Sequence, residues 1–319
     1  MGDIVSAETD TRCGFVAVIG APNAGKSTLV NRLVGAKVSI VTHKVQTTRA
    51  RVRGVAVKDR TQIVYIDTPG IFSPRRRLDR AMVAAAWEGA GEADATLLLV
   101  DAAAYRAAGK EGASAAARRS AEDVDRIVEA LKAAEKNVFL ALNKIDQMPR
   151  ATLLELASHF AETGVVSETF MISAERGDGV ADLEAHLLAR MPAGPWLFPE
   201  DQLSDITDRL MAAEVTREKL FLRLHQEIPY DLTVETERWE TTKKGELRVE
   251  QIVYVKRDSQ KALVLGKGGA TIKAVGAAAR TELAEILETP VHLFLTVKTR
   301  ERWEDEPARY REMGLDFAG

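Results

Sequence analysis

The chain has 319 residues, of which 46% are hydrophobic and 29% are charged, and its formal net charge is −3. This length fits two domains better than one. Because no overall positive charge attracts nucleic acid, any RNA affinity must come from a local patch. The single cysteine, Cys13, excludes an internal disulfide. We expect no signal peptide, since residues 1–12 are polar and acidic, and no membrane span, since the longest apolar run is only residues 95–100.

Short apolar runs alternate with helical patterns through the first part of the chain. The expected strands are residues 14–20, 62–66, 95–100, 137–142 and 169–172. The expected helices are residues 26–33, 78–88, 121–134, 153–160 and 180–189. This alternation predicts an α/β domain, a mostly parallel sheet with helices on both faces that binds ligands at the carboxyl ends of its strands. We interpret the alanine-rich residues 102–121 as a flexible excursion or a frayed helix without a site.

Prolines and glycines crowd together in residues 192–199, which indicates a linker. The expected organisation is therefore an N-terminal tail over 1–13, an α/β domain over 14–191, a linker over 192–199 and a second domain over 200–319. The second part has the pattern of a helix, two strands, a helix, a glycine loop, another helix and a final strand. That order predicts a small α+β domain.

The first motif that carries chemistry is a GxxxxGKS phosphate loop at the end of the first expected strand. Its backbone N–H groups are expected to surround a β-phosphate, with Lys26 reaching the β- and γ-phosphates and the Ser27 hydroxyl binding Mg²⁺. The nucleotide contacts expected from this segment are Gly20, Pro22, Asn23, Ala24, Gly25, Lys26, Ser27 and Thr28.

Two further motifs follow expected strands and indicate which nucleotide is bound. In Asp67-Thr68-Pro69-Gly70, the acid can hold the metal through water and the Gly70 N–H can meet the γ-phosphate. In Asn143-Lys144-Ile145-Asp146, the Asp146 carboxylate can accept both N1–H and N2–H₂ of guanine. Adenine would leave that carboxylate unpaired, so the motif selects GTP over ATP.

Two more segments complete the expected guanine nucleotide site. Lys144 would lie along the base plane with its alkyl stem, and a backbone N–H of Ser173 or Ala174 can meet guanine O6. Within residues 41–49 we choose Thr48, with Thr47 as the alternative, as the hydroxyl that completes the Mg²⁺ shell when a γ-phosphate is present. We expect residues 38–49 and 71–80 to carry the change between nucleotide states.

The expected catalytic groups are Lys26, Thr48 and Gly70, and no residue is an obvious general base. Many GTPases place a Gln directly after the DTPG motif, whereas this chain has Ile71. Because an apolar side chain cannot orient water, we expect slow intrinsic hydrolysis, on the order of 10⁻⁴ to 10⁻² s⁻¹. Asn23 is placed to help coordinate a monovalent cation such as K⁺, which would add positive charge at the site.

The second part of the chain contains a GxxG loop, the shape with which KH domains clamp single-stranded nucleic acid. Five basic residues and one acidic residue lie between Tyr254 and Val275, so positive charge is concentrated around this loop. We expect Ile272 and Val275 to line the groove under unstacked bases. The expected RNA contacts are Lys256, Lys261, Gly266, Lys267, Gly268, Gly269, Ile272 and Lys273.

In this order, the segments GAPNAGKS, QTTR, DTPGIF, NKID and VLGKGGATIK resemble the Era family of bacterial ribosome-assembly GTPases, over nearly the whole chain. The resemblance implies a P-loop GTPase domain followed by a type II KH domain. It implies GTP and GDP as ligands, with Mg²⁺. It further implies binding to the 3′ end of 16S rRNA in the GTP state, help in 30S subunit maturation, and a cytoplasmic protein that is partly associated with the inner membrane. We expect a monomer.

Two other hypotheses remain open at this point. In the first, the chain is a signalling or membrane-surface GTPase whose C-terminal domain binds protein. In the second, it is a non-switching RNA-binding module that uses nucleotide only as structural support. The first predicts no RNA affinity. The second predicts almost no turnover and an RNA affinity that does not depend on the nucleotide.

Overall fold

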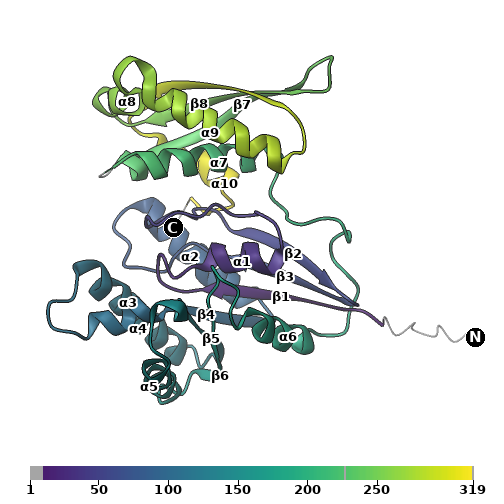
Figure 1. Ribbon diagram of the computed structural model, residues 1–319, viewed down its shortest axis with the longest axis vertical. Coiled ribbons are helices and arrows are strands. Elements are labelled where there is room, and N and C mark those ends of the chain that lie inside the picture. The colour runs from purple at the N-terminus through teal and green to yellow at the C-terminus, as the bar shows by residue number, and fades with distance from the viewer. Residues whose placement is uncertain (1–9, 226–227, 318–319) are drawn as a thin grey trace, which may run out of the picture.

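The computed structural model describes residues 10–225 and 228–317, so the expected N-terminal tail lies mostly outside the described residues. The chain forms a six-stranded and a three-stranded sheet, each covered by its own helices. Figure 1 shows the two parts stacked along the long axis of the molecule. Over the described residues, no helix is both long and apolar enough to cross a bilayer.

The first sheet has the strand order β2-β3-β1-β4-β5-β6. Its strands are β1 (Arg12–Ile19), β2 (Val52–Lys58), β3 (Thr61–Asp67), β4 (Ala95–Asp101), β5 (Val138–Asn143) and β6 (Val166–Met171). All neighbours are parallel except β2, which pairs with β3 in the antiparallel direction. The five expected strands are present, but our sequence analysis missed β2. Its three valines, at positions 52, 55 and 57, do not alternate regularly, and Gly54 interrupts the pattern.

Helices cover both faces of this sheet, as expected. The helices of the first part are α1 (Lys26–Val34), α2 (Arg77–Glu92), α3 (Ala102–Ala108), α4 (Ala115–Ala133), α5 (Arg150–Ala161) and α6 (Val180–Arg190). Side chains of α1 and α6 fill the core on one face, and side chains of α2, α4 and α5 fill it on the other. Each buried Leu or Ile in these layers contributes about 1.5–3 kcal/mol relative to exposure.

The alanine-rich stretch is not a flexible excursion. Residues 102–108 form α3 and residues 115–133 form α4, and Ser114 caps α4 by accepting a hydrogen bond from the Ala117 N–H. Tyr105 in α3 packs against Phe160 in α5, with ring centroids 5.0 Å apart. Alanine has the highest helix propensity, so these residues become helical once one side chain provides a tertiary anchor.

The second part is the expected α+β domain. Its elements are α7 (Asp208–Arg223), β7 (Leu232–Thr241), β8 (Leu247–Val255), α8 (Asp258–Leu265), α9 (Ala270–Ile286), β9 (Val291–Thr299) and α10 (Pro307–Glu312). The sheet order is β7-β8-β9, with β8 antiparallel to β7 and parallel to β9. Helices α7, α8 and α9 pack on one face of the sheet.

The connection between the two parts runs along the edge of the first sheet. Val55 in β2 donates its N–H to the Leu203 carbonyl at 2.8 Å, and Asp205 accepts a hydrogen bond from the Arg53 N–H at 2.9 Å. Residues 303–317 return to the first part, where Trp303, Tyr310 and Leu315 pack on α2 in one buried cluster. The two parts therefore touch in two places: the C-terminal segment packs on α2, and the connection pairs with β2.

Candidate functional site

The predicted nucleotide motifs meet at one edge of the first sheet. The phosphate loop follows β1, the DTPG segment follows β3, and the NKID and Ser173–Ala174 segments follow β5 and β6. Since β1, β3, β5 and β6 all run parallel, their carboxyl ends lie on the same side. The site is thus assembled from segments that are far apart in the sequence.

The phosphate loop curls around the Lys26 side chain. Its Nζ donates to the Gly20 carbonyl at 3.1 Å and to the Ala21 carbonyl at 3.0 Å. Burial lowers the pKa of Lys26 to about 8, and the nearby Asp67 carboxylate opposes part of that change. Gly25 has φ +99°, and a Cβ there would lie 2.4 Å from the Asn143 amide, so only glycine fits. The other expected contacts here, Pro22, Asn23, Ala24 and Thr28, lie in the same loop and at the start of α1.

The three expected metal ligands lie close to one another. The Ser27 hydroxyl is 2.8 Å from the Thr48 hydroxyl and donates to Asp67 Oδ2 at 2.7 Å, and Thr48 Oγ1 is 3.4 Å from the same oxygen. The alternative, Thr47, instead bonds the Thr42 hydroxyl and the Lys44 carbonyl in a local turn.

Asp67 shows how well this cluster suits a divalent cation. Its side chain is fully buried, and Oδ1 has no hydrogen-bond partner within the described part of the chain. Burial raises the pKa of Asp67, while the Ser27 hydroxyl and the Lys26 ammonium lower it in part. An oxygen donor set of one carboxylate and two hydroxyls is what Mg²⁺ prefers, so the residues present fit the ion.

The DTPG segment is held against the phosphate loop. The Ile71 N–H donates to the Gly20 carbonyl at 3.1 Å, and Gly70 lies directly beside Pro22. The Thr68 hydroxyl donates to the Val18 carbonyl at 2.7 Å, so this hydroxyl joins the DTPG segment to β1. Ile71 is buried in the apolar core, so its side chain cannot orient a water molecule.

Asn143 links the loops of the base side. It is buried, donates to the Ala24 carbonyl at 2.8 Å and accepts from the Ala174 N–H at 2.9 Å. The Ala174 N–H, which we expected to donate to guanine O6, thus already donates to Asn143 in this structure. Ser173 is also buried, and its hydroxyl accepts from the Arg176 N–H at 3.2 Å.

Two further residues of the base side escaped the sequence analysis. Lys144 Nζ donates to Asp101 at the end of β4 at 2.6 Å, and to the Asn23 carbonyl at 3.0 Å. Asp146 has Arg176 Nε 3.6 Å from Oδ2. Asp101 ends an expected strand just as the other motifs do, and this was a signal for it. Nothing in the sequence singled out Arg176.

The GxxG loop joins α8 to α9 and presents its residues outward. Gly266, Gly268 and Gly269 all have positive φ, and Gly268 has open space where a Cβ would be. Lys267 and Lys273 are exposed, while Lys261 and Ile272 are half-buried. The loop can therefore approach a ribose–phosphate backbone closely, with two cations free to meet phosphates.

Two expected RNA-side residues have other surroundings. Lys256 Nζ lies 2.7 Å from a Glu304 carboxylate oxygen and 3.1 Å from one of Asp231, so its charge is already paired. Val275 is fully buried in the core of the second domain, so the expectation that it lines the groove is wrong. It faces the sheet because the period of α9 turns it to the same side as Ala279 and Leu283.

Two known families match the chain in separate segments. The family described as "50S ribosome-binding GTPase" matches residues 15–144, and the KH domain family matches residues 227–304. The first segment contains the phosphate loop, the DTPG segment and the first two residues of the NKID motif. The second contains the GxxG loop.

Similar proteins cover almost all of the chain. GTPase Era of Caulobacter vibrioides is 59% identical over 307 residues, which is 96% of this chain and 97% of that protein. GTPase Era of Sinorhizobium medicae is 58% identical over 99% of this chain and 97% of its own length. A crystal structure of Era with MgGDPNP and nucleotides 1506–1542 of 16S ribosomal RNA superposes with a TM-score of 0.84, at 35% identity over 95% of this chain and 99% of that one. A variant of Aquifex aeolicus Era bound to GDP.AlF4- gives the same values. The chain therefore belongs to the Era family of GTPases.

Proposed function

We propose that the chain is a GTP-hydrolysing switch that binds the 3′ segment of 16S rRNA and assists maturation of the 30S subunit. Residues 14–191 would hold the nucleotide and residues 200–319 the RNA. One observation carries the proposal: a structural relative, alike over both parts, is bound to MgGDPNP and to 16S rRNA nucleotides 1506–1542. We propose that it works as a cytoplasmic monomer, with any membrane contact peripheral.

The nucleotide chemistry follows from the residues of the phosphate loop. Mg²⁺, when bound, would neutralise charge on the phosphates, and Ser27, Thr48 and Asp67 are the residues that would hold it. Lys26 lies inside the loop, where its ammonium can meet the β- and γ-phosphates. Asp146 at the base side accepts two hydrogen bonds from guanine, which adenine cannot donate.

The catalytic groups support a slow intrinsic reaction. Lys26, Thr48 and the Gly70 N–H stabilise the charge of the transferring phosphoryl group, and the buried Ile71 leaves the attacking water without a side chain to orient it. Asn23 is exposed in the phosphate loop with φ +62°. We propose that it helps to hold K⁺ beside the phosphates, so equal hydrolysis rates in Na⁺ and K⁺ buffers would refute this role.

The RNA part of the proposal is tested with a short single strand that copies the 3′ end of 16S rRNA. Binding is measured for the GTP-analogue and GDP states of the wild type and of Gly268→Asp. This substitution places a carboxylate among the phosphates without contacting a neighbour, because space is open there, although the φ of +59° strains any residue other than glycine. The matched control is Gly112→Asp, since Gly112 also has positive φ and open space but lies in the α3–α4 loop.

Each outcome of this experiment has a clear meaning. Binding that favours the GTP-analogue state and is lost only in Gly268→Asp supports the proposal. Equal binding in both states retains an RNA-binding module but removes the switch. Absence of binding in both states points to the alternative, a signalling or membrane-surface GTPase whose C-terminal domain binds protein.

A further inference from the structure

The segment expected to change with the nucleotide lies against the second domain along much of its length. The Val41 N–H donates to a Glu218 carboxylate oxygen at 2.8 Å, and the Lys37 ammonium lies 2.7 Å from the other oxygen. Further along, Lys44 Nζ donates to the carbonyls of Phe221 and Leu224. All three acceptor residues belong to α7 or to its C-cap. The loop over residues 37–49 is thus a domain interface as well as part of the nucleotide site.

Thr48 belongs both to the expected metal site and to the interface with the second domain. Its hydroxyl lies in the expected metal cluster, 2.8 Å from that of Ser27. On one side, the carbonyl of Thr47 accepts a hydrogen bond from Arg217 of α7. On the other side, the side chain of Arg49 enters the second domain. Both neighbours of the expected metal ligand are therefore held by the RNA-binding part of the chain.

Arg49 occupies a socket made entirely of the second domain and the C-terminal segment. Its Nη1 donates to the Leu232 carbonyl at 2.8 Å, and its Nη2 to the carbonyls of Tyr230 at 3.3 Å and Pro229 at 3.4 Å. The guanidinium carbon is 5.9 Å from the Phe221 ring centroid and 5.5 Å from that of Trp303. We call these five residues the Arg49 socket: Phe221, Pro229, Tyr230, Leu232 and Trp303.

Because Arg49 is buried, its contact with the socket is favourable only when the two domains are docked. Arg49 is only 2% exposed, and over the described residues its Nε has no hydrogen-bond partner, so the three carbonyls and two rings of the socket are what compensates its buried charge. A buried charge is costly unless its hydrogen bonds are made, so Arg49 is well placed only while the socket carbonyls surround it. Moving the second domain away would leave this side chain without its partners and release the backbone next to Thr48.

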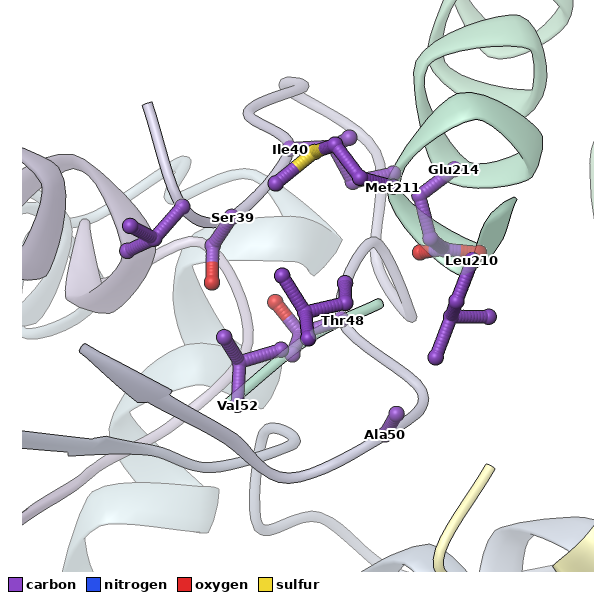
Figure 2. A pocket seen from close by; sticks show the side chains of 10 residues that line it. Ser39, Ile40, Thr48, Ala50, Val52, Leu210, Met211 and Glu214 are labelled. Carbon is purple, nitrogen blue, oxygen red and sulfur yellow. The ribbon is translucent and has the colours of Figure 1, made fainter. Parts of the chain in front are cut away.

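Direct packing between Thr48 and α7 is incomplete. A small pocket lies between the loop and the helix, lined by Ser39, Thr48 and Ala50 on one side and by Leu210, Met211 and Glu214 on the other. Figure 2 shows Thr48 across this pocket from α7. On the side of the second domain, the two flanking arginine contacts therefore hold the backbone around Thr48, while the Thr48 hydroxyl itself bonds Ser27 and Asp67.

We propose that the second domain positions Thr48 at the metal through the Arg49 socket and Arg217, so that GTP binding and seating of Arg49 stabilise each other. This inference rests on the proposed function and specifies its regulation. Arg49 is a positioning residue, because it acts on the metal site through Thr48. Linkage makes the effect reciprocal: whatever holds the socket in place strengthens GTP binding, and GTP strengthens docking of the domain.

The test uses the full chain and compares two nucleotides. Affinities for Mg²⁺ with a GTP analogue and for Mg²⁺ with GDP are measured for the wild type, Arg49→Ala and Arg49→Lys. The Thr48 hydroxyl is needed only when a γ-phosphate is present. Arg49→Ala should therefore weaken binding of the GTP analogue about 10- to 100-fold, as expected for lost charged hydrogen bonds, and leave GDP affinity within about twofold. Arg49→Lys should fall between, because lysine cannot reproduce the planar fork that reaches three carbonyls.

The matched control is Arg53→Ala. Arg53 also pairs with a residue beyond the linker, Asp205, at 3.3 Å, but it lies in β2 away from the metal cluster. Arg53→Ala should change neither the GTP-analogue affinity nor the GDP affinity. If Arg49→Ala does not fold, Arg217→Ala removes the hold on the other side of Thr48 and should show the same selective loss.

Two results would overturn the inference. The first is an equal loss of GTP-analogue and GDP affinity in the folded variants, which would mean that Arg49 supports the fold only. The second is no change for either nucleotide. Both leave the proposed function intact, because that depends on RNA binding and hydrolysis by the wild type.

Discussion

Asp67 is completely buried and, among the residues that the structure describes, its Oδ1 has no hydrogen-bond partner, which makes it the residue on which the metal site depends most. Its carboxylate receives one hydrogen bond from Ser27 and a longer one from Thr48, both to Oδ2. Oδ1 has no partner over residues 10–225 and 228–317. A cation, directly or through its water, would satisfy that oxygen and remove the penalty that raises the pKa of Asp67.

Replacing Asp67 by asparagine tests this interpretation. Asp67→Asn keeps the size of the side chain but removes its charge. We therefore expect the Mg²⁺ concentration needed for GTP-analogue binding to rise at least about tenfold, since charged contacts are worth about 1.5–3 kcal/mol. A magnesium titration followed by nucleotide binding measures this. The control is Asp59→Asn in the exposed β2–β3 turn, where asparagine tolerates the positive φ of +53°. An unchanged titration in Asp67→Asn would contradict the assignment.

Asp146 decides which base is bound in the proposed site. In Asp146→Asn the side chain presents an N–H donor where guanine also has a donor. We expect GTP affinity to fall about 100-fold or more and affinity for xanthosine triphosphate, which has a carbonyl at that position, to rise. Competition between the two nucleotides measures the exchange. Loss of both affinities would instead indicate damage to the loop, which Arg176 flanks at 3.6 Å.

At the level of helices and strands, α3 and α4 show how a weak sequence signal becomes a defined structure. The Tyr105 hydroxyl donates to Asp125 in α4 at 2.7 Å, and its ring packs on Phe160 and lies near His159 in α5. Burial and the hydrogen bond to Asp125 both raise the pKa of Tyr105 above its ordinary value, so its hydroxyl remains a donor even in alkaline solution. Tyr105 is therefore the aromatic anchor of the alanine-rich segment, beside the caps from Asp101 and Ser114.

Truncating this side chain should destabilise the element without affecting the nucleotide. We expect Tyr105→Ala to lower the free energy of unfolding by about 2 kcal/mol, and Tyr105→Phe, which removes only the hydroxyl and its contacts to Asp125 and His159, by about 1 kcal/mol. Urea denaturation measures both, and GDP affinity should stay the same. Equal effects of the two substitutions would mean that the ring contributes nothing.

Across the molecule as a whole, paired charges join the second domain to α2 of the first. Asp231 accepts from Arg76 at 2.9 Å and from Gln260 at 3.0 Å, and lies 3.1 Å from Lys256. Burial alone would raise the pKa of Asp231, but Lys256, Gln260 and Arg76 lower it below its ordinary value. Lys256, which the sequence assigned to RNA, thus contributes to the domain interface.

The direction of this shift predicts how the interface responds to acid. The pKa of Asp231 is lower in the folded protein than in the unfolded chain, so its contribution is fully present above about pH 4 and is lost as pH falls through the folded-state value. Asp231→Asn should remove this pH dependence and cost on the order of 1–3 kcal/mol at neutral pH. Unfolding free energies measured between about pH 2.5 and 7 test it. Parallel pH curves for the two proteins would show that Asp231 is not the responsible group.

Local patterns in the chain were enough to predict the order of most strands and helices, the GTPase and KH classes, and the motifs that meet at the strand ends. These features depend on periodicity and on loops that need particular residues. The same patterns missed β2, whose irregular valine spacing Gly54 interrupts, and misplaced Val275, whose orientation depends on the rotation of α9. They assigned Arg49 no role. Folding in three dimensions placed that side chain in a socket of another domain, since three carbonyls and two rings from distant segments meet only after both domains have folded and docked.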